Sequence, residues 1–348
     1  MGNQHIIEPN QVNRIHLVHF SDIYEVYYHY LSIHSKSDAL ELTRRYVVKT
    51  IHKSIEEQLA AFEFLYMNDF FDELENELDK KHYDKGAALV YSIILKRKDT
   101  PLTADEFAEL ESLHFTHPSL QSLRLFLLVY AHYDLKQYQG MDKYADEIQA
   151  SLFTINEPLL HYYLKLRYDE ISFVHYWKTN NLILAKKFAY KFINSDLAPR
   201  KYTAMHHHLA LCNAFHDYDE AMYYANKAAE LAEKHRLTRA LKSVSEHTIP
   251  FISAFHEKVG DIHTPDPVET AHINIMKGDL EPAITYLSSL KTLTPFQQSY
   301  LGLATRDKSM LLEAKDRFIN QYGDMFFAQL PEQYLLRIDS IKKEAVEI

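Results

Sequence analysis

Glycine and proline are scarce in this chain of 348 residues, which holds 7 glycines and 11 prolines. Sandwiches, barrels and doubly wound α/β folds need many turns, often with glycine at fixed places, so the composition disfavours these folds. The chain is also longer than the size at which one compact core usually keeps growing. We therefore expect long helices, arranged as two domains or as an elongated array of small units, and the composition favours the array.

Cysteine is rare as well, and long apolar runs are missing. Cys212 is the only cysteine, so no disulfide can form within one chain. No run of 18 apolar residues could span a membrane, and the first five residues lack the basic and apolar regions of a secretory signal. With 47% hydrophobic and 25% charged residues, the sequence predicts a folded, soluble, cytoplasmic protein without a membrane partner.

The charge balance is acidic. The 38 basic and 48 acidic residues give a formal net charge of -10, which provides no overall attraction to nucleic acid or to an anionic membrane. A local basic patch stays open as an alternative.

A repeated pattern runs through the second half of the chain. Ala185, Ala221 and Ala283 each lie five positions into a helical segment that follows a polar turn, and their separations are 36 and 62 residues. These spacings are near one and two helical hairpins of about 34 residues. The sequence therefore predicts an all-α fold of tetratricopeptide-like hairpins, stacked as a superhelix with a concave groove that can hold a peptide.

Two segments at the ends of the chain differ from this array. Residues 1–50 are rich in histidine, tyrosine and β-branched residues and are interpreted as an N-terminal element, with residues 51–348 forming the superhelix. Near the C-terminus, Leu335, Ile338 and Ile341 form an apolar stripe on a predicted helix. This helix is expected either to form a dimer interface or simply to cap the last repeat, as arrays of repeats require.

Motifs for catalysis and for metal binding are absent. The sequence has no glycine-rich phosphate loop, no Gly-x-Ser-x-Gly and no His-Glu-x-x-His, so we expect neither an enzyme nor a cofactor. His206, His207 and His208 are consecutive, and successive helical residues point about 100° apart, so one helix cannot direct all three at one ion. They are interpreted as packing or exposed histidines, and no metal site is predicted.

Several stretches of the chain carry a resemblance to a known family. They are Ala61–Leu74, Asp217–His235, Ile275–Leu287 and, most specifically, Leu301–Lys308 followed by Tyr322–Phe327. From about Leu40 to the C-terminus, the chain resembles the arbitrium receptors, or AimR, which are tetratricopeptide-like peptide sensors of temperate phages. The resemblance implies a receptor for a short phage-encoded peptide whose binding shifts the choice between lysis and lysogeny. It also implies that the peptide-free form is a DNA-binding activator.

The resemblance also implies a peptide pocket. By position, Arg200, Glu269 and Asp324 match charged residues of the family's pocket. Arginine can grip a peptide carboxylate through two parallel hydrogen bonds, and the two carboxylates can receive an arginine or amino group of the peptide. The plainer interpretation makes Arg200 an exposed cation at a helix start and Glu269 a carboxylate favoured by a helix N-terminus.

The chain departs from the family at three further pocket positions. Val174, Lys178 and Leu211 stand where the family has asparagines that bind the peptide main chain. The cognate peptide is therefore expected to differ from those of the relatives, or to be absent.

The N-terminus departs as well, since a complete helix-turn-helix is not evident. Only Glu8–Phe20 could correspond to a recognition helix, and Gln11, Asn13 and Arg14 are its candidate contacts to operator DNA or to another protein. The sequence thus leaves two hypotheses. The first is a peptide-responsive arbitrium-type regulator, and the second is a receptor-derived interaction module that lacks DNA binding and sequesters a regulatory protein.

Overall fold

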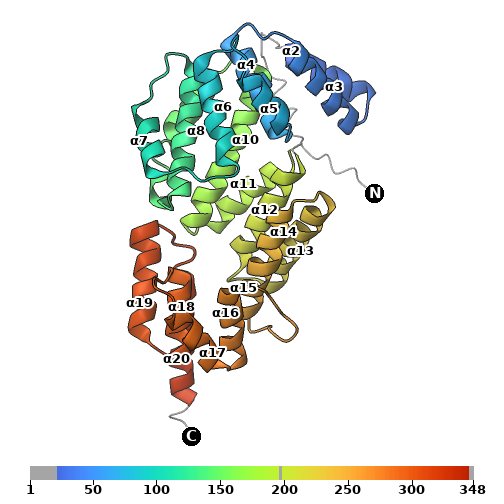
Figure 1. Ribbon diagram of the computed structural model, residues 1–348. Coiled ribbons are helices and arrows are strands. Elements are labelled where there is room, and N and C mark those ends of the chain that lie inside the picture. The colour runs from blue at the N-terminus through green and yellow to red at the C-terminus, as the bar shows by residue number, and fades with distance from the viewer. Residues whose placement is uncertain (1–21, 196–197, 345–348) are drawn as a thin grey trace. The chain divides into compact units, whose positions relative to one another are not determined.

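The computed structural model describes residues 22–195 and 198–344, with side chains as far as Ser340, and it is built from helices (Figure 1). No strand occurs within these ranges, which confirms the predicted all-α class. None of the described helices is both long and apolar enough to cross a membrane. The candidate contacts Gln11, Asn13 and Arg14 lie outside the described residues.

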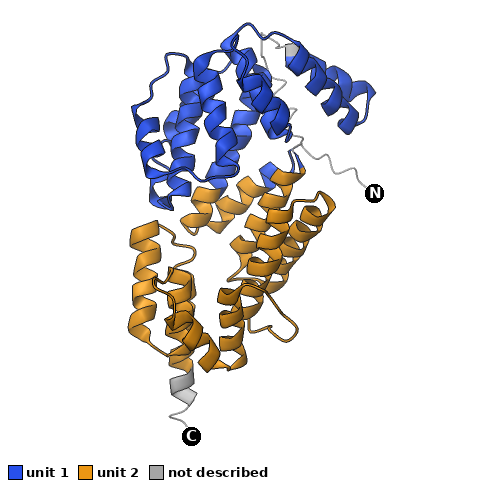
Figure 2. Ribbon diagram, viewed as in Figure 1, with its two compact units in different colours: residues 1–173, 190–198 blue, residues 174–189, 199–348 orange. Residues whose placement is uncertain are grey.

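The chain forms two compact units (Figure 2). Unit 1 runs to Phe173 and includes Tyr190–Ala198, and unit 2 comprises Val174–Ala189 and the chain from Pro199 onward. Unit 1 contains α2 (Asp22–Ile33), α3 (Lys36–Lys49), α4 (Ile55–Met67), α5 (Phe71–Leu78), α6 (Lys85–Arg97), α7 (Ala104–Ser112), α8 (Pro118–Asp134), the 3₁₀ turn η1 (Tyr138–Gly140), α9 (Ala145–Leu152) and most of α10 (Pro158–Lys178).

Unit 2 contains most of α11 (Leu182–Ile193), α12 (Pro199–Asn213), α13 (Tyr218–Lys234), α14 (Thr238–Lys242), η2 (Ser243–Thr248), α15 (Ile249–Phe255), α16 (Pro267–Lys277), α17 (Leu280–Ser288), α18 (Pro295–Ala304), α19 (Lys308–Asp316), η3 (Arg317–Tyr322) and α20 (Gln329–Glu344). Both η2 and η3 are π-helical turns. The division between the units falls inside α10 and α11, so the last turn of α10 belongs to unit 2.

The predicted boundary near residue 50 stays a prediction, because residues 1–21 of that N-terminal element are not described. Its described part, α2 and α3, packs as a helical hairpin and belongs to unit 1.

Prolines and capping residues explain where many helices begin. Pro118, Pro158, Pro199 and Pro267 are the first residues of α8, α10, α12 and α16. Proline suits this position because its fixed φ is helical and its missing N–H would have no partner in the helix. Side chains that accept hydrogen bonds from the first-turn N–H groups cap further helices, and they include Ser54, Asp84, Thr103, Asp217, Thr294 and Asp307.

Consecutive helices pack as antiparallel hairpins, including α12 with α13, α16 with α17, and α18 with α19. Ala221 and Ala283 lie on the second helices of two of these pairs, α13 and α17, and Ala185 lies on α11. Ala185, Ala221 and Ala283 are each at most 1% exposed, so they stand where one helix approaches its neighbour closely. A side chain larger than a methyl group would force the helices apart.

The C-terminal helix α20 covers the last hairpin. Tyr334 and Ile338 are 0% and 1% exposed, so Ile338 packs within its own chain, as the capping interpretation expects. Leu335 is half-buried, and the side chain of Ile341 is outside the described part. The exposed leucines of this region are Leu312 of α19 and Leu336 of α20.

A buried ion pair holds four helices of unit 1 together. Arg167 of α10 donates to both carboxylate oxygens of Glu63 of α4, over 2.6 and 3.0 Å. Tyr91 of α6 donates its hydroxyl to the same carboxylate over 2.6 Å, and Arg167 also donates to the Tyr130 hydroxyl of α8 over 3.1 Å. The Arg167 and Glu63 side chains are 2% and 0% exposed. Each charge therefore depends on the other for its stabilisation.

Removing one charge of this pair should destabilise the protein strongly. For Arg167→Met we expect a loss of about 3–5 kcal/mol in the free energy of unfolding, because Glu63 would stay buried without its counter-charge. Urea denaturation followed by circular dichroism measures this loss. Lys227→Ala, which breaks the exposed Lys227–Glu230 pair, is the control and should leave the unfolding midpoint unchanged. Similar midpoints for the two variants would contradict the proposed importance of the buried pair.

Candidate functional site

The six positions assigned to the peptide pocket all lie in unit 2. Val174 and Lys178 are on the last turn of α10, Arg200 and Leu211 are near the two ends of α12, Glu269 is in the first turn of α16, and Asp324 follows η3. Val174, Lys178 and Asp324 are buried, whereas Arg200, Leu211 and Glu269 are half-buried.

The structure brings two of these positions into direct contact. The Lys178 ammonium donates to Asp324 Oδ2 over 2.7 Å, and each side chain is 5% exposed. Burial lowers the pKa of Lys178, and the adjacent Asp324 opposes this effect. Sequence analysis assigns both residues to the pocket but does not predict that they pair.

The π-helical turn η3 and Gly323 aim Asp324 at Lys178. Gly323 ends η3 with φ +69°, a left-handed conformation that glycine adopts without strain. Directly after it, the Asp324 N–H donates to the Phe318 carbonyl over 2.8 Å, and Asp324 Oδ1 accepts from the Phe327 N–H over 3.0 Å. The Lys178 carbonyl accepts from the N–H groups of Met325 and Phe326, over 2.8 and 3.2 Å. Backbone and side chain therefore tie α10 to the segment after η3.

Aromatic rings surround this ion pair. The Lys178 ammonium lies 4.1 Å from the ring centroid of Trp177 and 4.6 Å from that of Phe327, within the range of a cation–π interaction. Phe327 in turn packs against Phe215, Phe251, Phe296, Phe318 and Phe326, with ring centroids 4.9–6.4 Å apart. We call these rings, with Trp177, the aromatic cluster. It keeps water from the ion pair and strengthens the attraction between its charges.

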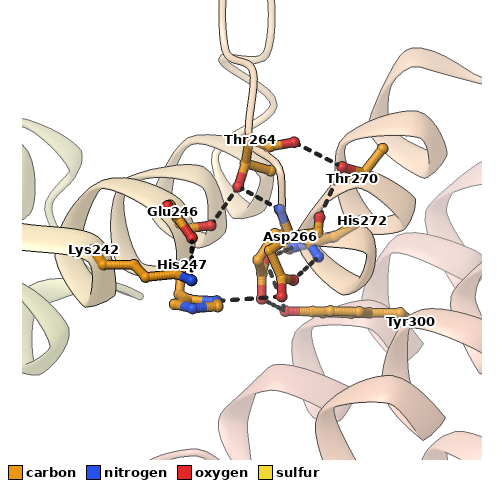
Figure 3. Close-up of polar contacts among 9 residues, drawn as sticks. Lys242, Glu246, His247, Thr264, Asp266, Thr270, His272 and Tyr300 are labelled. Atoms are coloured by element: carbon orange, nitrogen blue, oxygen red, sulfur yellow. Dashed lines mark hydrogen bonds and ion pairs between the residues drawn. The ribbon is translucent and has the colours of Figure 1, made fainter. Parts of the chain in front are cut away.

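A second polar cluster lies at the start of α16 and includes Asp266 and Tyr300 (Figure 3). Asp266 caps α16 by accepting from the Glu269 N–H over 2.8 Å, and Tyr300 of α18 donates its hydroxyl to the Glu269 carboxyl group at 3.3 and 3.4 Å. Burial, together with the nearby Asp266 carboxylate, raises the pKa of Glu269 to about 8, against the opposing effect of the Tyr300 hydroxyl. Most Glu269 carboxyl groups therefore hold a proton at neutral pH.

His272 extends this cluster into the core. Its ring is fully buried and stacks on Tyr300 with centroids 4.0 Å apart, and its Nε2 forms a hydrogen bond with the Tyr334 hydroxyl. Burial lowers the pKa of His272 to about 3. His272 Nδ1 lies 3.5 Å from Glu269 Oε2, a distance that would suit an ion pair. We interpret the contact as one between neutral groups, because burial favours the uncharged form of both.

The π-helical turn η2 contacts both α12 and the start of α16 through its side chains. His207 of α12 and Thr248 of η2 share a hydrogen bond of 2.6 Å, and His247 Nδ1 lies 3.6 Å from Asp266 Oδ2. In Figure 3 the side chains of His247, Asp266 and Tyr300 converge at the start of α16. Burial lowers the pKa of His207 to about 3, so it also stays neutral. Over the described residues, no group of three His, Cys, Asp or Glu side chains could hold a metal ion.

Sequence reasoning misses much of this site. Neither π-helical turn is evident in the sequence, because each lies inside an ordinary helical pattern. His272 is detectable in principle, since a residue three positions after Glu269 lies on the same helix face. Tyr300 and Tyr334 come from distant helices and give no local signal.

Comparison with protein-family models identifies a family that covers most of the chain. The model described as "AimR transcriptional regulator-like" matches residues 39–337, which include all six pocket positions.

The chain belongs to this family.

Known proteins similar to this AimR-like chain include an uncharacterized protein of Bacillus anthracis. It is 24% identical over 224 residues, which cover 61% of this chain and 82% of the relative. Two solved structures are also similar, each with 18% identity. A ligand complex of phAimR has a TM-score of 0.74 and covers 91% of this chain and 98% of its own. A selenomethionine phAimR has a TM-score of 0.63, with 90% and 84% covered. These structures confirm the helical-repeat fold.

The raised pKa of Glu269 predicts a pH-dependent stability. Between the unfolded-state pKa near 4.5 and the folded-state pKa of about 8, the folded state holds more protons than the unfolded state. The free energy of unfolding therefore falls as pH rises through this range, and the loss is complete above about 8. Glu269→Gln cannot ionise and should not show this loss. The melting temperature of the variant should match that of the wild type near pH 5 and exceed it by several degrees at pH 8, at about 1–2 °C per kcal/mol for a chain of this length.

The matched control is Glu281→Gln, which changes an exposed carboxylate in the first turn of α17. Its difference from the wild type should be the same at both pH values. A Glu269→Gln difference that does not grow with pH would contradict a protonated Glu269.

Proposed function

We propose that this AimR-like protein is a peptide-sensing transcription regulator of the arbitrium type. Its unit 2 would bind a short signal peptide in the host cytoplasm and so influence a phage's choice between lysis and lysogeny. The observation that carries the proposal is the family match over residues 39–337, which contain every position that the resemblance assigns to the pocket. The fold similarity to a ligand-bound phAimR supports it further.

The chemistry of the half-buried positions fits a peptide. Arg200 offers a guanidinium group for a carboxylate, and Glu269 offers a carboxyl group that lies beside Asp266 and Tyr300. A cationic peptide group would favour the ionised form of Glu269 and would thereby lower its raised pKa. Part of the binding free energy would be used to remove the proton, so binding should become tighter as pH rises towards 8.

Peptide binding can be tested by titrating the protein with the short peptides encoded beside its gene. One of them should raise the melting temperature along a saturable curve, since a ligand that binds only the folded state stabilises it. Glu269→Gln should weaken binding by about tenfold or more, through loss of a charge-assisted contact. It is a better variant for this purpose than Asp324→Ala, which would leave Lys178 buried without its partner. The control Glu281→Gln should bind like the wild type.

Failure of every encoded peptide to bind the folded wild type would contradict the proposal. The alternative would then be the interaction module that sequesters a regulatory protein. Stoichiometric capture of one protein partner, with no operator DNA retained by the full-length chain, would favour that alternative.

We also propose that the protein forms a homodimer through α19 and α20. Leu312 and Leu336 are 58% and 59% exposed. Ion pairs between the same two helices, Lys308–Asp339 and Lys315–Glu332, flank them. Exposed leucines rimmed by charges are typical of an interface.

Sedimentation velocity tests the dimer. The wild type should sediment as a dimer, and Leu312→Glu/Leu336→Glu should sediment as a monomer, because two carboxylates would be buried at the interface. Leu89→Glu, at an exposed leucine of α6, is the control and should remain dimeric. A monomeric wild type, or a double variant that is still dimeric, would refute this assignment.

A further inference from the structure

We propose that Lys178 determines which ligands unit 2 accepts. It would do so by filling, from within the chain, the place beside Asp324 that a cationic group of a ligand would otherwise take. This inference rests on the proposed function, because it concerns the peptide site. The predicted ligand has a neutral group facing Asp324, and any cationic group of the ligand lies at Glu269.

The first argument is that both oxygens of Asp324 are already used. Oδ2 accepts from the Lys178 ammonium over 2.7 Å, and Oδ1 accepts from the Phe327 N–H over 3.0 Å. The Asp324 side chain is 5% exposed. A ligand cation would therefore have to displace the ammonium of Lys178 and then stand in the same place.

The second argument is that Lys178 is fixed along its whole length. Its carbonyl accepts from the N–H groups of Met325 and Phe326, and its ammonium lies against the rings of Trp177 and Phe327. Lys178 is also the last residue of α10, where a cation is stabilised by the negative end of the helix dipole. An ammonium held in this way competes with a ligand at a very high effective concentration.

The third argument is the contrast with Glu269. Within the described residues, no lysine or arginine forms an ion pair with Glu269, whose carboxyl group contacts the Tyr300 hydroxyl and His272 Nδ1. Of the two carboxylates assigned to the pocket, only Glu269 is therefore without a cationic lysine or arginine partner among the described residues. A cationic group of the ligand would bind at Glu269, and none would bind at Asp324.

Chemical rescue tests whether the place beside Asp324 accepts a cation. Lys178→Ala leaves Asp324 without its counter-charge, and n-propylammonium restores the atoms that the substitution removes. We expect n-propylammonium chloride to raise the melting temperature of Lys178→Ala by several degrees along a saturable curve. Neither 1-propanol nor sodium chloride at equal concentration should do so. The wild type and Lys178→Ala/Asp324→Ala should not respond to n-propylammonium beyond the effect of sodium chloride.

A shift of the same size in the double variant, or no shift in Lys178→Ala, would overturn the inference. If Lys178→Ala does not fold unaided, its refolding from urea replaces the melting experiment. Recovery of near-UV circular dichroism with n-propylammonium and not with 1-propanol is then the expected result, and no recovery with either compound overturns the inference.

A second experiment addresses the ligand itself. The peptide that binds the wild type is compared with derivatives that carry lysine at each position in turn. Lys178→Ala should bind one derivative at least about tenfold more tightly than the parent peptide, because a buried carboxylate regains a cation, whereas the wild type should not prefer that derivative. Equal binding of the parent and all derivatives by Lys178→Ala would make the ion pair purely structural.

Failure of the two proposals can be told apart. If no peptide binds the wild type, the proposed function fails, and the n-propylammonium titration still shows whether a cation can enter beside Asp324. If a peptide binds and Lys178→Ala gains no preference for lysine, the proposed function stands and the role of Lys178 in specificity is refuted.

Discussion

Charges that water cannot reach must find their partners inside the protein, and each unit is organised around one such pair. Glu63 and Arg167 join α4 to α10 in unit 1, and Lys178 and Asp324 join the end of α10 to the segment after η3 in unit 2. Because an isolated buried charge is very unfavourable, each pair fixes the placement of its helices more narrowly than apolar packing alone. Apolar contacts tolerate small shifts, whereas a salt bridge of 2.7 Å does not.

The two polar clusters of unit 2 differ in the ionisation of their buried side chains. Lys178 and Asp324 are paired in their charged forms among aromatic rings. Glu269 and His272 are placed in surroundings that favour their neutral forms. Because Glu269 is half-buried, its neutral carboxyl group can still be ionised when a cationic group binds beside it. The Glu269 cluster can therefore respond to a ligand. The Lys178 pair is already complete.

Sequence reasoning reaches the fold because its signals are local. Scarce glycine and alanines at hairpin spacing predict stacked helices, and the structure has them. The site is harder to predict because its contacts span long separations. Lys178 and Asp324 are 146 residues apart, and His272 and Tyr334 are 62 apart. Apolar stripes are ambiguous as well, since Ile338 faces its own core while Leu336 faces solvent.

The π-helical turns have a consequence for evolution by insertion and deletion. A π turn accommodates about one residue more than the α-helical turn it replaces, and every side chain after it is rotated by about 100° relative to an uninterrupted helix. The turn η3 lies two residues before Asp324, whereas α15 and a loop separate η2 from Glu269. A homologue without the extra residue of η3 would therefore present a different side chain at the position of Asp324. Aligning such a homologue with this chain would require a gap of one residue within η3.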